Sequence, residues 1–145
     1  MDYSRESRSG TTLVELCVVV VVFAALCAIA LPRLHDVRDR MAARAAIQET
    51  SALFSLARRS AISRRAFVGV VIDTAAGAVT VRIGGTRIAH QGLRGRYGVL
   101  LKASRDSMSF DPRGLGYGAA NLTVSARKGR AAETLFVSRL GRTRH

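Results

Sequence analysis

Residues 10–32 read GTTLVELCVVVVVFAALCAIALP, and this stretch decides the architecture of the chain. From Leu16 to Leu31 every side chain is uncharged and apolar. With residues 11–15 the run has about 21 residues, and a helix of that length, rising 1.5 Å per residue, just crosses a bilayer core of about 30 Å. Such a run is too long for an ordinary strand, so it predicts a membrane-spanning helix.

The charge of the chain is divided unevenly along its length. The 145 residues have a formal net charge of +13, yet a mean hydropathy of +0.15. Residues 1–10 have no net charge, residues 11–32 contain one charged side chain, and residues 33–145 carry 21 basic and 7 acidic side chains. An apolar content of 48% excludes a disordered chain. The basic part is long enough for one small domain.

Three kinds of N-terminal segment compete for the apolar run. A secretory signal peptide would use Ala28-Ile29-Ala30 as its cleavage site, but Glu15 would then place a carboxylate in its apolar region. A lipoprotein signal needs a small residue before the modified cysteine, whereas leucine precedes both Cys17 and Cys27. The third kind, a short polar leader that ends at Gly10 before a retained helix, fits best.

The same residues resemble the type IV prepilin signature. A glycine ends the leader, and with Thr11 as the first mature residue, Glu15 is the fifth and Pro32 the twenty-second, as in that family. The family usually has phenylalanine where this chain has Thr11. The resemblance implies that a prepilin peptidase cleaves between Gly10 and Thr11 and that Thr11 is then N-methylated. The helix would remain as an inner-membrane anchor and as the core of a filament of pilin subunits.

Two residues of this helix have expected roles. An ionised carboxylate near the bilayer centre costs about 2.5–3.5 kcal/mol, so Glu15 needs a partner or a purpose. Cleavage would provide a partner during subunit assembly, the new α-amine at Thr11 of a neighbouring subunit. The local alternative is that Glu15 lies near the membrane surface and stabilises the start of its own helix. Pro32 is expected to kink the helix where it leaves the membrane.

Two signals disagree on which side of the membrane the large domain lies. The flanking arginines are Arg5 and Arg8 before the run, and Arg33, Arg38, Arg40 and Arg44 after it. Their number would keep the large domain in the cytoplasm. The prepilin signature instead implies a single-pass inner-membrane protein with a periplasmic head, which later enters the pilus or pseudopilus. We follow the signature.

The chain after Pro32 divides where the glycines begin. Twelve of the 13 glycines lie at position 69 or later, whereas residues 33–65 are rich in helix formers and are expected to continue the helix. The apolar stripe expected to face the core is Leu34, Val37, Met41, Ala45, Ala52 and Leu56. The expected strands of the head, residues 66–145, are 67–73, 79–83, 86–90, 99–103, 107–110, 122–127 and 134–138. The fold class is α+β, a long helix packed on an antiparallel β head.

Three segments of this part resemble the GspH/FimT group of minor pilins and pseudopilins. They are LARRSAI at 56–62, FDPRG at 110–114 and FVSRLGRTR at 136–144. The resemblance implies a pilin-like fold and a structural subunit of a type II secretion pseudopilus or a type IV pilus. The implied partners are other pilin or pseudopilin subunits, the prepilin peptidase/methyltransferase and the inner membrane.

Catalytic chemistry finds little support in the sequence. His35, His90 and His145 have no metal-ligand spacing, and Ser60 and Ser138 have no histidine nearby in the chain. The glycine-rich segment 114–118 lacks the spacing of a phosphate loop and is expected to be a loop or hairpin turn. We therefore expect no enzyme activity, metal or cofactor.

Binding of DNA is a second hypothesis, because basic residues cluster at 94–97, at 127–130 and at 139–144. Arginines that contact phosphates give salt-sensitive affinity without sequence readout. The candidates are Arg127, Lys128, Arg130, Arg139, Arg142 and Arg144. The terminal GRTR resembles the Gly-Arg-x-Arg of FimT-like pilins, which is implicated in DNA uptake. The alternative is a solvated basic face, also compatible with anionic lipid headgroups. A single-pass membrane protein that binds a polyanion without polymerising stays open as well.

Overall fold

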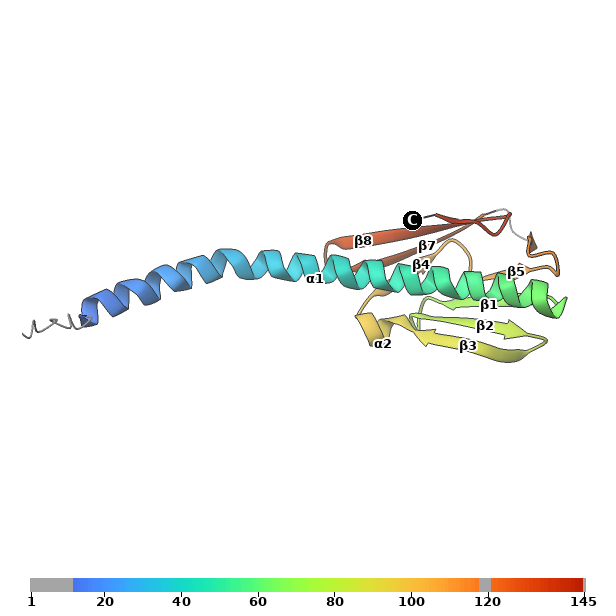
Figure 1. Cartoon of the computed structure of the whole chain (residues 1–145), viewed down its shortest axis with the longest axis horizontal. Helices are drawn as coiled ribbons and strands as arrows, with labels where there is room; N and C mark the ends of the chain where they lie inside the picture. The colour runs from blue at the N-terminus through green and yellow to red at the C-terminus, as the bar shows by residue number, and fades with distance from the viewer. Residues whose placement is uncertain (1–11, 118–120, 145) are drawn as a thin grey trace, which may run out of the picture. The chain divides into compact units, whose positions relative to one another are not determined.

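The computed structural model describes residues 12–117 and 121–144 (Figure 1). Helix α1 comprises Leu13–Arg64. The chain forms two compact units, which meet at the bond between His35 and Asp36. In the first unit, the helical side chains are almost all exposed, and α1 is the one helix of the described residues long and apolar enough to cross a membrane. The second unit, Asp36–His145, contains the rest of α1 and the strands. From here on we call this whole unit the head, whereas the head expected from the sequence begins at residue 66.

Both ends of α1 are fixed by local hydrogen bonds. At the start, the Thr12 hydroxyl accepts a hydrogen bond from the backbone N–H of Glu15 at 3.3 Å, which is an N-cap. At the end, Arg65 has a φ of 48°, its N–H bonds to the Ile62 carbonyl, and the Ala66 N–H bonds to the Ala61 carbonyl. This pair of bonds is a Schellman cap, which turns the chain back toward the first strand.

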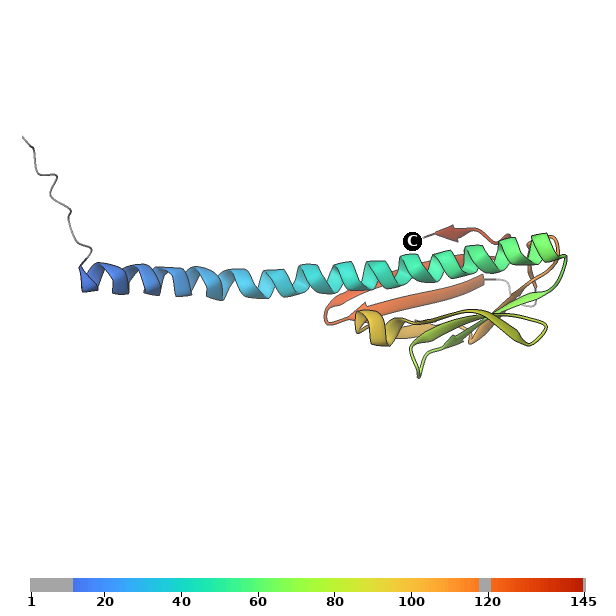
Figure 2. The ribbon, with the colours of Figure 1, turned by 60° about the horizontal axis from the view of Figure 1, so that its bottom comes forward.

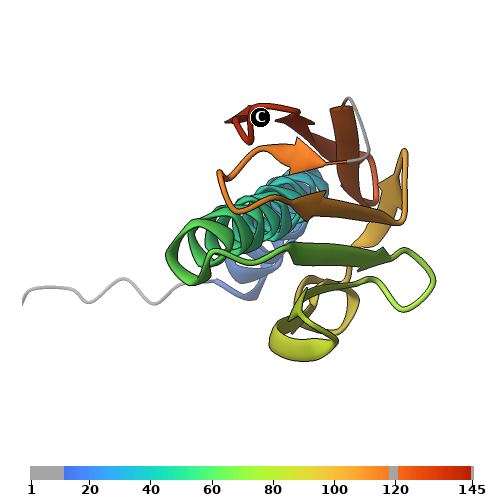
Figure 3. The same cartoon turned by 90° about the vertical axis from the view of Figure 1, so that its right-hand side faces the viewer.

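The head contains two antiparallel sheets joined by one core. The first has the strand order β3-β2-β1-β5-β6 and the second the order β4-β7-β8-β9. The elements are β1 (Val68–Asp73), β2 (Ala78–Ile83), β3 (Thr86–Gly92), α2 (Leu93–Tyr97), β4 (Leu100–Ala103), β5 (Ser107–Phe110), β6 (Gly116–Tyr117), β7 (Asn121–Lys128), β8 (Ala131–Ser138) and β9 (Thr143–Arg144). Seen end-on, the strands of both sheets curve round the head part of α1 (Figure 3). The fold class predicted from the sequence is therefore confirmed.

The predicted core stripe of α1 is wrong. Leu34, Val37 and Met41 are 50%, 50% and 67% exposed, Ala52 is exposed, and Ala45 and Leu56 are half-buried. The buried face is instead made of Ala43, Ala46, Ile47, Thr50, Leu53, Phe54, Ala57, Ser60 and Ala61. Four of these nine residues are alanines, so the backbone of α1 comes close to the strands. The larger side chains of the predicted stripe lie on other faces of the helix and remain in solvent.

The predicted strands all form, with ends that differ by up to three residues, but the sequence did not predict three short elements. Helix α2 follows β3 directly and contains Gly95, which weakens any helical signal. The strands β6 and β9 have two residues each and exist through pairing with β5 and β8. For segment 114–118 the sequence predicts a loop or hairpin turn, and Gly116 and Tyr117 pair with Phe110 and Ser109 as the second strand of a short hairpin.

One corner of the head ties α1 to two turns. The Asp111 carboxylate accepts hydrogen bonds from the backbone N–H groups of Arg113 and Leu115, both at 2.9 Å, and forms an ion pair with the Arg113 side chain at 3.0 Å. The backbone hydrogen bond from Leu115 is the main reason that the pKa of Asp111 lies below its usual value. The Arg58 guanidinium of α1 donates to the Gly141 carbonyl at 3.4 Å. Arg58 thus holds the turn after β8.

Replacing Gly141 with alanine should destabilise the head more than the same change at Gly84. Both residues have a positive φ, of 70° and 52°, which costs alanine about 1–2 kcal/mol at either position. At Gly141 the new Cβ would also lie 2.9 Å from Arg58 Cδ and 3.0 Å from the Gly114 carbonyl oxygen, whereas at Gly84 nothing lies within 4 Å. This crowding should cost about 1–3 kcal/mol more. Thermal unfolding followed by tyrosine near-ultraviolet dichroism measures the difference, and equal melting temperatures would contradict it.

Candidate assembly helix and basic surfaces

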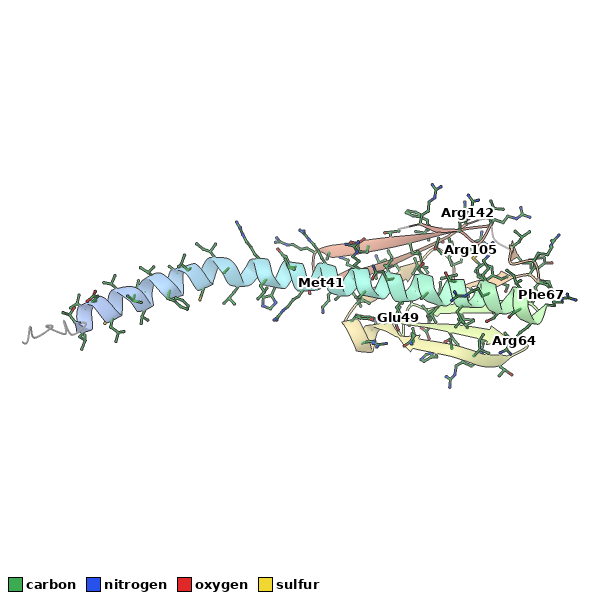
Figure 4. The ribbon with its side chains drawn as sticks, viewed as in Figure 1. Met41, Glu49, Arg64, Phe67, Arg105 and Arg142 are labelled. Atoms are coloured by element: carbon green, nitrogen blue, oxygen red, sulfur yellow. The ribbon has the colours of Figure 1, made fainter. Side chains whose placement is uncertain are left out.

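The apolar part of α1 exposes more hydrophobic surface than a soluble chain tolerates. Eight large apolar side chains between Leu13 and Val22, together with Phe23, Leu26, Ile29 and Leu31, are all more than half exposed. A soluble monomer rarely exposes a continuous apolar surface of this extent, which marks a membrane or protein interface. Beyond Pro32 the exposure continues with Leu34, Val37 and Met41. Figure 4 labels Met41 on α1.

Glu15 is the single charged residue of this apolar segment and lies in the first turn of α1. Its backbone N–H is capped by Thr12, and its side chain is exposed. The ion pairs among residues 12–117 and 121–144 are Arg96–Glu49, Arg113–Asp111 and Lys128–Asp39, so Glu15 forms none with a described residue. The cleavage site predicted at Gly10 and Thr11 lies outside the described residues.

The basic turn between β7 and β8 packs on α1. The Arg127 guanidinium donates to the Gly129 carbonyl at 3.3 Å, and the Lys128 ammonium lies 3.9 Å from the Asp39 carboxylate. Gly129 itself approaches the same carboxylate so closely that a Cβ there would collide with it. Arg127 and Arg130 are exposed. The turn is therefore held at Asp39, the fourth residue of the head.

The other three DNA-binding candidates lie in and beside the turn between β8 and β9. In this turn the Ser138 N–H bonds to the Arg142 carbonyl and the Gly141 N–H to the Ser138 carbonyl, both at 2.9 Å. Arg139, Arg142 and Arg144 are exposed. A groove of about 460 Å³ is lined by Asn121, Thr123, Phe136, Val137, Ser138, Leu140, Arg142 and Arg144. Phe136, 56% exposed, lies directly opposite Arg144 in the strand pair, so its ring is available beside two guanidinium groups.

The structure separates the six predicted DNA-binding residues into two sets of three. Ala131 and Ser138 begin and end β8, and they pair with Lys128 and Asn121 of β7. Seven residue steps along a strand correspond to about 24 Å. The β7–β8 turn and α2 lie at the end of the head where α1 enters it, and the β8–β9 turn lies toward the other end (Figure 1, Figure 2). Arg142, which belongs to the set at the β8–β9 turn, is labelled in Figure 4.

The residues considered for catalysis are dispersed. His90 on β3 shares a 2.9 Å hydrogen bond with the Thr80 hydroxyl, Ser60 lies on the buried face of α1, and the Ser138 hydroxyl accepts from the Arg142 N–H at 3.2 Å. Within residues 12–117 and 121–144 no three His, Cys, Asp or Glu side chains gather in a way that could hold a metal ion. His145 lies outside the described residues.

The sequence did not reveal two features of these surfaces. One is the position of Arg58 between the backbones of Gly114 and Gly141, which brings two distant glycines together. The other is the groove beside Phe136. Leu135, Phe136 and Val137 are three consecutive apolar residues, so a strand there must present an apolar side chain on each face, but the sequence does not say which face is buried.

Comparisons with known proteins agree with this architecture. Residues 46–141 match the model of the family described as Type II transport protein GspH. In structure the chain is similar to the type IV minor pilin FimU of Pseudomonas aeruginosa, with a TM-score of 0.59 and 17% identity over 70% of this chain and 86% of that one. It is also similar to the minor pseudopilin EpsH of the type 2 secretion system of Vibrio cholerae, with a TM-score of 0.55 and 16% identity over 70% and 94%.

No curated protein matches the chain in sequence. At these identities the two structures establish the fold. The family match covers about two thirds of the chain and includes α1 from Ala46, both sheets apart from β9, and the Arg58 corner. The chain therefore belongs to the GspH family of type II transport proteins.

Proposed function

We propose that the chain is a minor pilin or pseudopilin subunit that assembles through α1 after removal of residues 1–10. In this proposal the prepilin peptidase cleaves between Gly10 and Thr11 and methylates Thr11. Residues 11–32 then anchor the subunit in the inner membrane with its head in the periplasm. The GspH family is one of structural proteins rather than enzymes, which fits a role in assembly.

The exposed apolar face of α1 is the observation that carries the proposal. A bilayer core covers about 20 helical residues, which accounts for the exposed side chains up to Leu31. Val37 and Met41 belong to the head, yet they are 50% and 67% exposed and take no part in its core. Helices of neighbouring subunits would cover the exposed apolar residues before Pro32 and those after it. A protein that was only anchored would gain nothing from the exposed apolar residues after Pro32.

Glu15 supports the same proposal by its chemistry. In the filament core, away from water, its carboxylate would be costly without a positive partner. The new α-amine of a neighbouring subunit provides one, and the pair sets the axial register of the two helices. The capping bond between Thr12 and the Glu15 backbone uses the N–H and not the carboxylate, so it leaves that carboxylate free for the pair.

Replacing Glu15 with valine or glutamine should block assembly into filaments while leaving cleavage of the leader intact. The carboxylate would no longer meet the neighbour's α-amine, and we expect at least a tenfold loss of the subunit from purified filaments. Glu133→Gln in the head is a control of the same chemistry. The mass of the membrane-extracted subunit reports cleavage, and immunoblots of sheared filaments report assembly. Normal incorporation of Glu15→Val would favour an anchored protein that does not polymerise.

The double change Val37→Ser and Met41→Ser should lower incorporation several-fold without lowering the melting temperature of the head. Both side chains are exposed in the isolated subunit, so their loss costs the folded subunit little, but it removes apolar contact area from the filament. Leu140→Ser, at a residue that is 57% exposed, is the matched control. If the double variant and the control assemble equally well, this part of α1 is not an interface.

A second candidate function is binding of single-stranded DNA at the C-terminal groove, and it rests on Phe136. The exposed Phe136 ring lines the same groove as Arg142 and Arg144. An aromatic ring can stack on a base, and nearby guanidinium groups can bind the phosphates of a single strand. This candidate concerns a subunit of a DNA-uptake pilus rather than a secretion pseudopilus. Both candidates share the same anchor and assembly helix.

The changes Arg142→Gln and Arg144→Gln should reduce the slope of log affinity against log salt by about 1.4 for a single-stranded oligonucleotide, because two phosphate contacts are lost. Phe136→Ala should weaken single-stranded DNA by about 5- to 100-fold through lost stacking and leave duplex DNA little changed. Titrations of residues 36–145, which form one compact unit, measure both effects. Arg82→Gln with Arg87→Gln is the control pair. If DNA affinity is unchanged in these variants, or if no binding is detected, the role in a secretion pseudopilus is favoured.

A further inference from the structure

We infer that the outer face of β4 and the β7–β8 turn form a docking groove for anionic phospholipid headgroups of the membrane that anchors the chain. A second groove of about 440 Å³ lies there, lined by Gly98, Leu100, Lys102, Arg127, Lys128 and Gly129. The chain has two lysines, and both line this groove. The inference rests on the inner-membrane anchoring proposed above.

The strand register sets the character of this groove. Leu100 pairs with Arg127 and Lys102 with Ser125, so Leu100, Lys102 and Arg127 share the outer face of the second sheet. All three side chains are exposed, whereas Leu101 between them is buried. The terminal atoms of Lys128 pass over Gly98, where a Cβ would lie 3.5 Å from them. The result is a cationic groove with an apolar side chain in its wall.

Chain connectivity limits how far this groove can lie from the bilayer. Gly129 and Lys128 contact Asp39, which follows Pro32 by seven residues. Seven residues span about 10 Å as a helix and about 24 Å when fully extended. The headgroup region adds about 5–8 Å to each side of the hydrocarbon core. With residues 11–32 in the bilayer, chain connectivity therefore keeps Asp39, and the basic turn that contacts it, within about 24 Å of the end of the span, a distance from which the turn can reach the headgroups.

The charges around Asp39 favour an anionic surface. The exposed basic residues nearest in sequence to the contact are Arg38, Arg40 and Arg44 on α1 and Arg127 and Arg130 on the turn. The acidic residues in the same segments are Asp36 and Asp39, and Asp39 already pairs with Lys128. Each basic residue near an anionic leaflet raises the population of the docked head about fivefold.

The lining residues favour lipid over nucleic acid as the occupant. Among the six residues that line this groove none is aromatic, whereas the groove at the other end of β8 presents Phe136. Leu100, 57% exposed, suits the boundary between headgroups and acyl chains. Docking would hold the head against the membrane before assembly, and a subunit would have to release the lipids in order to rise into a filament.

The test uses the full chain in vesicles and measures the distance of the head from the membrane. Cys17→Ala and Cys27→Ala remove the native thiols, and Ala132→Cys places a donor dye opposite Arg127 in the strand pair. Energy transfer is measured to acceptor-labelled lipids in vesicles of phosphatidylcholine alone or with about one third phosphatidylglycerol. We expect higher transfer with phosphatidylglycerol, and a return to the lower value at high salt.

Matched variants separate docking from anchoring. Arg127→Gln, Lys128→Gln and Arg130→Gln together should lower the ratio of docked to free heads by up to about 100-fold, while Arg82→Gln, Arg87→Gln and Arg105→Gln should leave it unchanged. Flotation of every variant with the vesicles checks the anchor, and its loss would contradict the proposed function instead. Equal transfer in both kinds of vesicle, or equal effects of the two triple variants, would overturn the docking proposal. So would loss of DNA binding in the first triple variant with lipid proximity unchanged.

Discussion

The whole structure depends on an apolar helix surface that the chain cannot bury by itself. The strands of the head cover one face of α1, from Ala43 to Ala61, and the helix before Asp36 has no described strand to cover it. The hydrophobic effect therefore acts between this chain and its surroundings as well as within it. Membrane anchoring and assembly into a filament are two ways to satisfy the same constraint, because lipid tails and neighbouring helices both exclude water from α1.

Side-chain size determines which face of α1 is buried in the head and which face is exposed. Alanines at the buried positions let both sheets approach the helix, and Phe54 fills the remaining space against Phe110, with the ring centroids 6.4 Å apart. The larger Val37 and Met41 are left outside. In a soluble monomer this arrangement would leave apolar side chains exposed to water with no partner to bury them. In a subunit that must pack against copies of related helices, it keeps the head folded on one face and leaves another face for the partners.

The sequence predicted those features that depend on neighbouring residues. Local periodicity and turn residues predict the apolar run, the change from helix to strands near Gly69, and the seven main strands. The core face of α1 was assigned wrongly because large apolar residues were weighted over alanines. The hydrogen bond of Arg58 joins residues 83 positions apart, so no local pattern encodes it. Strand β9 pairs with the neighbouring β8, but its two residues are too few to show a strand pattern. The basic candidates were found as residue types, but their separation into two surfaces follows from the eight-residue length of β8.

The two basic surfaces are both fixed to α1, and this links their availability to the position of the helix. The β7–β8 turn is held at Asp39 and the β8–β9 turn at Arg58, which are 19 residues and about 28 Å apart along the helix axis. In the proposed assembly, a subunit that left the bilayer for a filament would carry both turns with α1. The β7–β8 turn would then lose the proposed contact with headgroups, whereas the groove beside Phe136 is not proposed to bind lipid. Taken together, the proposals confine lipid binding at the β7–β8 turn to the subunit before assembly and leave the groove beside Phe136 available in the assembled subunit.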